Sequence, residues 1–250
     1  IRYLTGDRGI FTAEDVMRNI NPEDVHKPIT RLVSLENTSN RGGGKIYPVD
    51  VIQSIKKVCD EHQLMLHLDG SRLMNAIVAS GTSPKVYGEL FDTITICFSK
   101  GFGCPMGSIL TGKKVHLDKA RRVRKAFGGG MRQDEIISSG MRQAGNKATT
   151  CRYRLDNNVN RLEQDHQHAK TLGACLSNLS YVQDLLSVET NIVIFRLADG
   201  IVDNHFIQYL ASHDIHAFAI GDNWVRFVTH LDVNTTQINE VVEVLQNYHT

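Results

Sequence analysis

The run His67-Leu68-Asp69-Gly70-Ser71-Arg72 places a carboxylate at the end of an apolar segment, and Phe98-Ser99-Lys100-Gly101-Phe102-Gly103 places an amine at the end of the next one. The two apolar segments, 64–68 and 93–98, are short and rich in aliphatic residues, so each predicts a buried strand. Residues 74–79 between them have a helical pattern. Strand, helix and strand in this order predict parallel neighbours in one sheet, with Asp69 and Lys100 at its carboxyl edge.

The same alternation extends upstream. Residues 32–35 predict another short strand, the polar and glycine-rich segment 37–44 predicts a turn, and apolar residues at helical spacing over 51–58 predict a helix. Asn37 would then lie at the same carboxyl edge as Asp69 and Lys100. The fold class expected is α/β, with a mostly parallel sheet in a large domain.

The second half of the chain changes character. Apolar spacing over 152–179 predicts one long helix, which we expect to connect two domains. Beyond it, 191–197 and 224–229 predict strands, and 202–212 and 235–248 predict helices. We therefore expect a large domain over 1–165 and a small α+β domain over 166–250.

Composition excludes several classes of function. The 250 residues are 41% hydrophobic, which suits a globular enzyme, and a net charge of +1 lacks the basic excess of proteins that bind nucleic acid or anionic membranes. No apolar run is long enough to span a membrane, and Ile1 does not open a signal peptide, so we expect the chain to begin inside a longer protein. Five cysteines without CxxC spacing favour free thiols, a cytoplasmic location and no metal site. A small-molecule substrate is expected.

The pairing of Asp69 with Lys100 suits a pyridoxal phosphate site. A carboxylate keeps the pyridine nitrogen protonated, and an amine holds the cofactor's aldehyde as a Schiff base. Taken singly, Asp69 could be a helix cap and Lys100 a solvated side chain. The glycines that flank Lys100 favour close packing against a planar group, and Arg72, one turn beyond Asp69, can bind a carboxylate through two hydrogen bonds.

Other candidate residues have simpler interpretations. A lone histidine in a strand, such as His67, is expected to be structural. The basic stretch 121–125 predicts a solvated helix face, and Gly128-Gly129-Gly130 after it predicts a turn.

Several motifs together resemble the threonine aldolase group of the β-eliminating lyase family, whose members act on L-threonine or L-allo-threonine. These motifs occur in the family's order: Leu35-Glu36-Asn37-Thr38, His67-Leu68-Asp69-Gly70-Ser71-Arg72, Ser99-Lys100-Gly101-Phe102-Gly103, Gly128-Gly129-Gly130-Met131-Arg132-Gln133 and Val225-Arg226-Phe227-Val228-Thr229-His230. The resemblance implies the aspartate aminotransferase fold (fold type I) and pyridoxal 5'-phosphate as cofactor.

The resemblance also implies roles for single residues. Lys100 would be the Schiff-base lysine, Asp69 would partner the pyridine nitrogen, and Arg72 with Arg226 would bind the substrate's α-carboxylate. His26 matches a family histidine near the substrate's β-hydroxyl. Further residues complete the implied site. The cofactor would also contact Arg72, Ser99, Asn37 and Arg132, and the substrate would contact Lys125. Lys125 and Arg132 would reach the neighbouring subunit's site in a homodimer or homotetramer.

Two departures from the family are expected to matter. Family members carry a further N-terminal segment, with a loop that cradles the cofactor's phosphate and a histidine that stacks on its ring. In addition, Met131-Arg132-Gln133 recurs as Met141-Arg142-Gln143, which indicates an insertion beside the subunit interface.

The function expected from the resemblance is a lyase of threonine catabolism and glycine biosynthesis. It would cleave a β-hydroxy-α-amino acid by retro-aldol chemistry into glycine and an aldehyde, acetaldehyde in the case of threonine. Two alternatives stay open: β-elimination or transamination on the same scaffold, and a non-catalytic fragment of such an enzyme.

Overall fold

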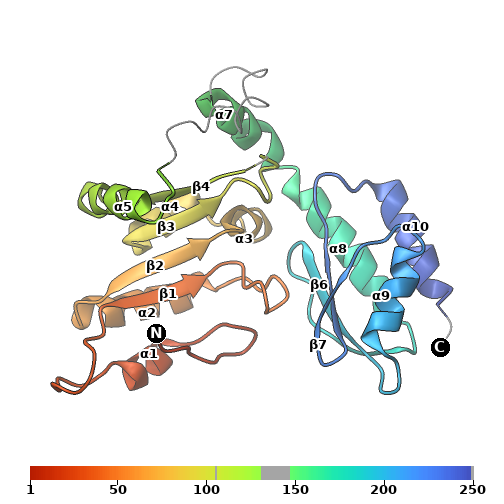
Figure 1. Ribbon diagram of the computed structural model, residues 1–250, viewed down its shortest axis with the longest axis horizontal. Coiled ribbons are helices and arrows are strands. Elements are labelled where there is room, and N and C mark those ends of the chain that lie inside the picture. Colours follow the sequence, from red (N-terminus) through yellow and green to blue (C-terminus); the bar gives the residue numbers. More distant parts are fainter. Residues whose placement is uncertain (105, 131–146, 249–250) are drawn as a thin grey trace.

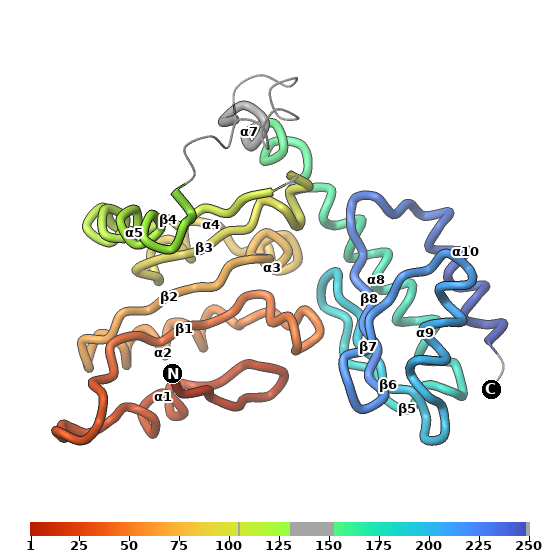
Figure 2. Tube along the Cα trace, viewed as in Figure 1, coloured from red at the N-terminus to blue at the C-terminus, as the bar shows by residue number. Residues whose placement is uncertain are grey.

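The computed structural model describes residues 1–104, 106–130 and 147–248, and in it the chain forms two bodies, each built on a sheet (Figure 1). The first sheet has the strand order β1-β2-β3-β4 and the second the order β5-β6-β8-β7. The trace in Figure 2 shows the two bodies side by side, joined by the segment that contains α8. The carboxyl ends of β1, β2 and β3 point toward the second body (Figure 1).

The first sheet is mostly parallel, as predicted. Strands β1 to β3 run parallel, and β4 returns antiparallel to β3. The strands are β1 (Leu32–Glu36), β2 (Met65–Gly70), β3 (Thr93–Cys97) and β4 (Ser108–Gly112). The helices of this body are α1 (Ala13–Asn19), α2 (Val49–Glu61), α3 (Leu73–Ser80), α4 (Pro84–Leu90) and α5 (Lys114–Ala126). Asp69 is the fifth residue of β2 rather than the residue after it.

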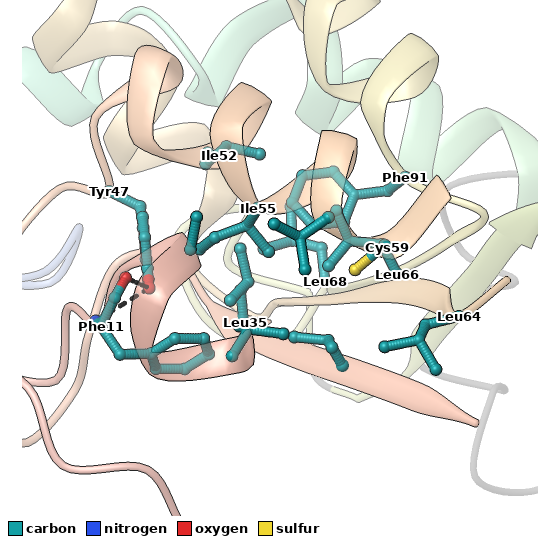
Figure 3. Close-up of a cluster of buried hydrophobic side chains, with 14 of the residues drawn as sticks. Phe11, Leu35, Tyr47, Ile52, Ile55, Cys59, Leu64, Leu66, Leu68 and Phe91 are labelled. Carbon is teal, nitrogen blue, oxygen red and sulfur yellow. Dashed lines mark hydrogen bonds between the residues drawn. The ribbon is translucent and has the colours of Figure 1, made fainter. Parts of the chain in front are cut away.

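One apolar face of α2 covers this sheet. Ile52, Ile55 and Cys59 are fully buried and recur at helical spacing, and they pack with Leu66 and Leu68 of β2 (Figure 3). At the edge of this core, the Tyr47 hydroxyl donates to the Phe11 carbonyl at 2.6 Å and accepts from the Phe11 amide at 2.9 Å. Burying apolar surface in this way contributes about 25 cal/mol per Å².

The second body is an antiparallel sheet with helices packed on it. Its strands are β5 (Val182–Leu185), β6 (Ile192–Leu197), β7 (Phe218–Gly221) and β8 (Trp224–Val228). Its helices are α8 (Leu162–Leu176), α9 (Asp203–Ala211) and α10 (Thr235–Gln246). Aromatic rings fill the core, with Phe195 edge-on to both Phe206 and Phe227. Asn234 opens α10 with a capping box to Gln237.

The single long helix expected over 152–179 is wrong. The structure has two helices, α7 (Lys147–Asn158) and α8, separated by a turn at 159–161. The side chain of Asn158 donates to the Phe102 carbonyl at 2.7 Å instead of facing solvent, so the chain leaves the helical path where this asparagine is anchored. Apolar periodicity continues through the break and does not reveal it.

A loop of the second body holds the glycine-rich loop of the first. Glu189 accepts from Arg8 Nη1 at 3.0 Å and from the Ile46 amide at 2.9 Å, and Thr190 donates to the Gly44 carbonyl at 2.9 Å. Gly44 has a φ of +74°, and a Cβ there would lie 2.3 Å from Thr190 Oγ1, so this close approach needs glycine. The proposed domain boundary at 165/166 falls inside α8, which packs on α3 as well as on α10.

No helix in the described residues is long and apolar enough to cross a membrane.

Candidate active site

The carboxyl ends of neighbouring strands bring Asp69 to the centre of the sheet's edge. Asp69 lies opposite Glu36 of β1 and Thr95 of β3, and its carbonyl accepts from the Asn37 amide at 3.0 Å. Its carboxylate oxygen Oδ1 accepts from the Ser71 amide at 3.0 Å and from the Ser71 hydroxyl at 2.6 Å. The carboxylate therefore has a fixed orientation, while Oδ2 accepts no hydrogen bond from the residues that the structure describes.

Lys100 begins a tight turn, with Phe98 and Ser99 between it and the end of β3. The Gly103 amide donates to the Lys100 carbonyl at 2.8 Å, which closes the turn. Packing fixes the turn from outside, because Phe102 receives the hydrogen bond from Asn158 and a Cβ on Gly101 would lie 3.0 Å from Leu162 Cδ2. The Lys100 side chain is exposed, and no described residue forms a hydrogen bond or ion pair with its amine. The backbone is held in place and the amine is available.

Two arginines from different bodies converge beside this edge. Arg72 is the N-cap of α3 and Arg226 lies on β8, and the Nη1 of each donates to Asn40 Oδ1 at 3.2 Å. Burial, and next the charge of Arg226, lower the pKa of Arg72, whereas Glu36 acts in the opposite direction. Arg226 Nε is buried and has no partner among the described residues. The pair suits an anionic acceptor with two oxygens.

A cavity of about 350 Å³ lies next to Arg226 and Asn40. Phe218 of β7 forms part of its wall, and its ring centre is 5.7 Å from Cζ of Arg226. The residues that line the cavity are Asn40, Arg41, Ile194, Phe218, Ala219, Ile220 and Arg226. It combines an apolar wall with cationic groups, an arrangement typical of sites for small organic anions.

Asn37 is not free to contact a ligand. Its side chain is fully buried, with Oδ1 accepting from the Tyr47 amide at 3.2 Å and Nδ2 3.5 Å from the Tyr87 hydroxyl. Asn37 thus anchors the loop after β1, and these contacts give no support to the cofactor-binding role expected for it. Ser99 is exposed beside Lys100, and its hydroxyl lies 3.4 Å from Cys97 Sγ.

His26 is exposed in a turn that precedes β1, and its amide donates to Asp24 Oδ1 at 2.9 Å. Residues 27–31 separate it from the start of β1. Among the described residues, His26 forms no hydrogen bond or ion pair with the side chains at this edge, and the role expected for it near a substrate stays a prediction.

Lys125 on the basic helix and His67 of β2 form no hydrogen bond with Asp69, Lys100, Arg72 or Arg226 among the described residues. Lys125 lies in the last turn of α5, a helix without buried residues that packs beside β4. Arg132 lies outside the described residues. His67 Nδ1 is 2.8 Å from Thr93 Oγ1, and burial lowers its pKa, in agreement with the structural role expected for it.

Sequence reasoning missed Asn40 and Phe218. Asn40 lies in the polar turn that follows the Leu35-Glu36-Asn37-Thr38 motif, but nothing in that turn marks one amide as the acceptor of two arginines. Phe218 belongs to a short edge strand in which no residue is buried, and it is 63% exposed. Only their short distances to Arg226 identify Asn40 and Phe218 as part of the candidate site.

The residues present fit pyridoxal phosphate. The group requires an amine for its aldehyde and a carboxylate for its ring nitrogen. Lys100 offers an amine without a partner among the described residues, and Asp69 offers a carboxylate that Ser71 orients through one oxygen only.

Comparisons with known proteins agree with this arrangement. The family model for beta-eliminating lyases matches residues 1–199. A low specificity L-threonine aldolase from Escherichia coli is 37% identical over 237 residues, which cover 93% of this chain and 65% of that protein. A low-specificity L-threonine aldolase from Candida albicans is 39% identical over 235 residues, which cover 92% of this chain and 58% of that protein. The chain thus spans about three fifths of the length of these curated relatives.

A solved structure shares the fold. The threonine aldolase of Leishmania major superimposes with a TM-score of 0.77 at 21% identity, covering 96% of this chain and 68% of that one. This likeness supports the expected fold type, a mostly parallel sheet with a smaller antiparallel body. With a family match over most of its length, the chain belongs to the beta-eliminating lyase family.

Proposed function

We propose that the protein is a pyridoxal phosphate-dependent lyase that cleaves threonine or allo-threonine into glycine and acetaldehyde. The observation that carries this proposal is the convergence of Arg72 and Arg226, from two bodies, beside the edge that bears Asp69 and Lys100. An α-amino acid has a carboxylate for the two arginines, and its amino group can then lie toward the cofactor. The names of the relatives from Escherichia coli and Candida albicans support the same reaction.

The chain's own residues would hold the cofactor at both ends of its ring. Lys100 would bind it through the amine and Asp69 would face the ring nitrogen. Bound there, pyridoxal phosphate supplies a protonated ring that withdraws electrons from a bond at the substrate's Cα. Ser71 keeps Asp69 Oδ1 in place through two hydrogen bonds, so that the carboxylate does not have to reorganise during the reaction.

Arg72 and Arg226 would select and orient the substrate. Two guanidinium groups can each donate to a carboxylate oxygen, and two anchored oxygens restrict rotation about the bond between the carboxylate and Cα. Fixing that rotation directs the Cα–Cβ bond relative to the ring, which is the kind of orientation that accelerates a reaction. We propose His26, or a water that it holds, as the acceptor of the proton from the substrate's β-hydroxyl.

The experiment is a spectrum and a product analysis of the purified chain. With pyridoxal phosphate added, we expect a visible absorbance band that borohydride abolishes, and with threonine we expect glycine and acetaldehyde in equal amounts. Lys100→Ala should lose both the band and turnover without unfolding, because the side chain is exposed. Lys57→Ala, a 79% exposed lysine on α2, is the matched control and should keep both.

Other outcomes contradict the proposal in distinct ways. A band and turnover that persist in Lys100→Ala would remove Lys100 from the site. Ammonia and a keto acid would indicate elimination or transamination, and no band in the unsubstituted chain would indicate a non-catalytic fragment.

Finer properties of the proposal concern assembly and location. We propose a homodimer or homotetramer in which Lys125 and Arg132 reach the neighbouring subunit's site. The exposed face of α5, with no buried residue of its own, supports an interface there. The reaction and the free thiols at Cys59, Cys97 and Cys175 support a place in threonine catabolism and glycine biosynthesis in the cytoplasm.

A further inference from the structure

Asn40 occupies the point at which the two proposed carboxylate-binding arginines meet. A single uncharged oxygen, Oδ1 of Asn40, accepts from Arg72 Nη1 and from Arg226 Nη1, both at 3.2 Å. The arginines come from separate bodies, so the amide bridges α3 and β8. A carboxylate oxygen bound by the same two donors would have to take this position.

The amide is a weak partner for these donors. Hydrogen bonds from a cation to a neutral oxygen are weaker than those to a carboxylate, and the two guanidinium groups repel each other in a partly buried place. Arg226 Nε, buried and without a partner among the described residues, has donor capacity that Asn40 leaves unused. An incoming carboxylate therefore exchanges weak acceptor contacts for charge-assisted ones.

The backbone around Asn40 is held while its side chain keeps two rotatable bonds. The Asn40 amide donates to Glu36 Oε2 at 3.1 Å, and the neighbouring Ser39 amide donates to the Lys45 carbonyl at 2.9 Å. Gly44 is tied to both Ser39 and Thr190. The side chain can rotate out of the contact without movement of the loop.

We propose that Asn40 is a positioning residue that stands in for the substrate's carboxylate: it holds Arg72 and Arg226 together in the ligand-free protein, and the carboxylate displaces it. This inference rests on the proposed function and adds that the substrate's carboxylate replaces Asn40 between Arg72 and Arg226. Asn40 stabilises the ligand-free state and makes no contact with the two arginines once a carboxylate is bound.

A substitution at position 40 should accordingly change the ligand-free state alone. Asn40→Ala leaves the repulsion between the arginines unrelieved, so the free protein loses stability and carboxylate binding becomes tighter. Asn40→Asp is isosteric and places a negative charge between the arginines, so the free protein gains stability and binding becomes weaker. The two variants move affinity in opposite directions, which neither a merely structural residue nor a direct ligand contact would do.

The experiment measures binding of glycine to the cofactor-loaded chain by calorimetry, together with Tm in the absence of glycine. We expect the dissociation constant of glycine to fall about threefold in Asn40→Ala and to rise about tenfold or more in Asn40→Asp. The Tm without glycine should follow the opposite order of affinity, with Asp highest and Ala lowest.

The control for the added charge is Asn239→Asp, at an exposed asparagine on α10 away from the site. It should change neither the dissociation constant of glycine nor the Tm without glycine. Weaker glycine binding in both Asn40 variants, unchanged binding in Asn40→Asp, or no glycine binding by the unsubstituted chain would overturn the inference. Threonine cleavage is scored separately: opposite shifts of glycine affinity without cleavage would reject the proposed reaction and keep Asn40 as the carboxylate's stand-in.

Discussion

His166 on α8 lies 3.0 Å from Asn75 on α3, ring Nε2 to amide Oδ1, in a buried contact between the two bodies. Because an amide oxygen only accepts, Nε2 carries a proton in this contact. Asn75 follows Arg72 by less than one helical turn, so this bond fixes the start of α3, where the proposed substrate site begins.

The first prediction concerns acid stability. Burial, with a smaller effect of Lys170, lowers the pKa of His166 to about 4 from its ordinary 6.5. A depressed pKa means that the folded state favours the neutral ring. The contribution of His166 to the free energy of unfolding is therefore complete above pH 6.5 and is lost as the pH falls toward 4. The loss amounts to at most about 3 kcal/mol.

Urea unfolding of the chain and of His166→Gln at several pH values checks this prediction. The variant should be less stable at pH 7 and should depend less on pH between 6.5 and 4. Burial also lowers the pKa values of His67 and His168, but these residues contribute equally to the pH dependence of stability in both proteins. His216→Gln, at an exposed position, is the control, and parallel curves for His166→Gln and the unsubstituted chain would contradict the assignment.

The second prediction concerns the charge of Asp69. Asp69→Asn can keep the hydrogen bonds to Ser71 but cannot stabilise a proton on the cofactor's ring nitrogen. Turnover at saturating cofactor should fall about a hundredfold, with little change in Tm. Ser71→Ala removes the 2.6 Å hydrogen bond to Asp69 Oδ1 and should lower turnover about tenfold.

Asp60→Asn, at an exposed position on α2, provides the comparison for loss of one negative charge. Turnover by Asp69→Asn equal to that of this control would show that the carboxylate has no chemical role.

The third prediction concerns the aromatic wall. Phe218→Leu removes the ring that lies 5.7 Å from the guanidinium carbon of Arg226, a cation–π contact of about 0.5–1 kcal/mol at an exposed site. The KM for threonine should rise about threefold with kcat nearly unchanged, because the ring orients Arg226 rather than the reacting atoms.

Steady-state kinetics of Phe218→Leu and of Tyr3→Leu, at a residue 87% exposed, separate this effect from a general loss of aromatic surface. If kcat fell and KM stayed constant, the ring would act on the chemistry instead of on substrate binding.

The fourth prediction concerns the contact between the bodies. Glu189→Ala removes acceptors for Arg8 Nη1 and for the Ile46 amide, and leaves partly buried donors unpaired. The free energy of unfolding should fall by about 1–3 kcal/mol. The matched variant Glu89→Ala breaks an exposed pair with Lys85 and should cost no more than about 0.5 kcal/mol.

Denaturant titrations compare the two variants directly. Equal losses would mean that Glu189 is an ordinary surface charge and does not hold the glycine-rich loop.

Much of the fold could be predicted from local patterns. Aliphatic runs before Asn37, Asp69 and Lys100 predicted parallel strands, and these runs correspond to β1, β2 and β3. The break between α7 and α8 could not be predicted, because it depends on the bond from Asn158 to Phe102, a residue far away in the sequence. Short edge strands such as β4 and β7 carry few buried residues and hence little pattern.

The sequence by itself determined which side chains share the carboxyl edge of the first sheet. Alternating strands and helices allow one parallel arrangement, and that arrangement aligns Asp69 with Glu36 and Thr95. Only the tertiary structure decided which of the candidates meet. The packing of one body on the other brings Arg226 to Arg72 through Asn40. Contacts between segments distant in the sequence depend on how two apolar cores and the loops between them fit together, and no local pattern encodes that fit.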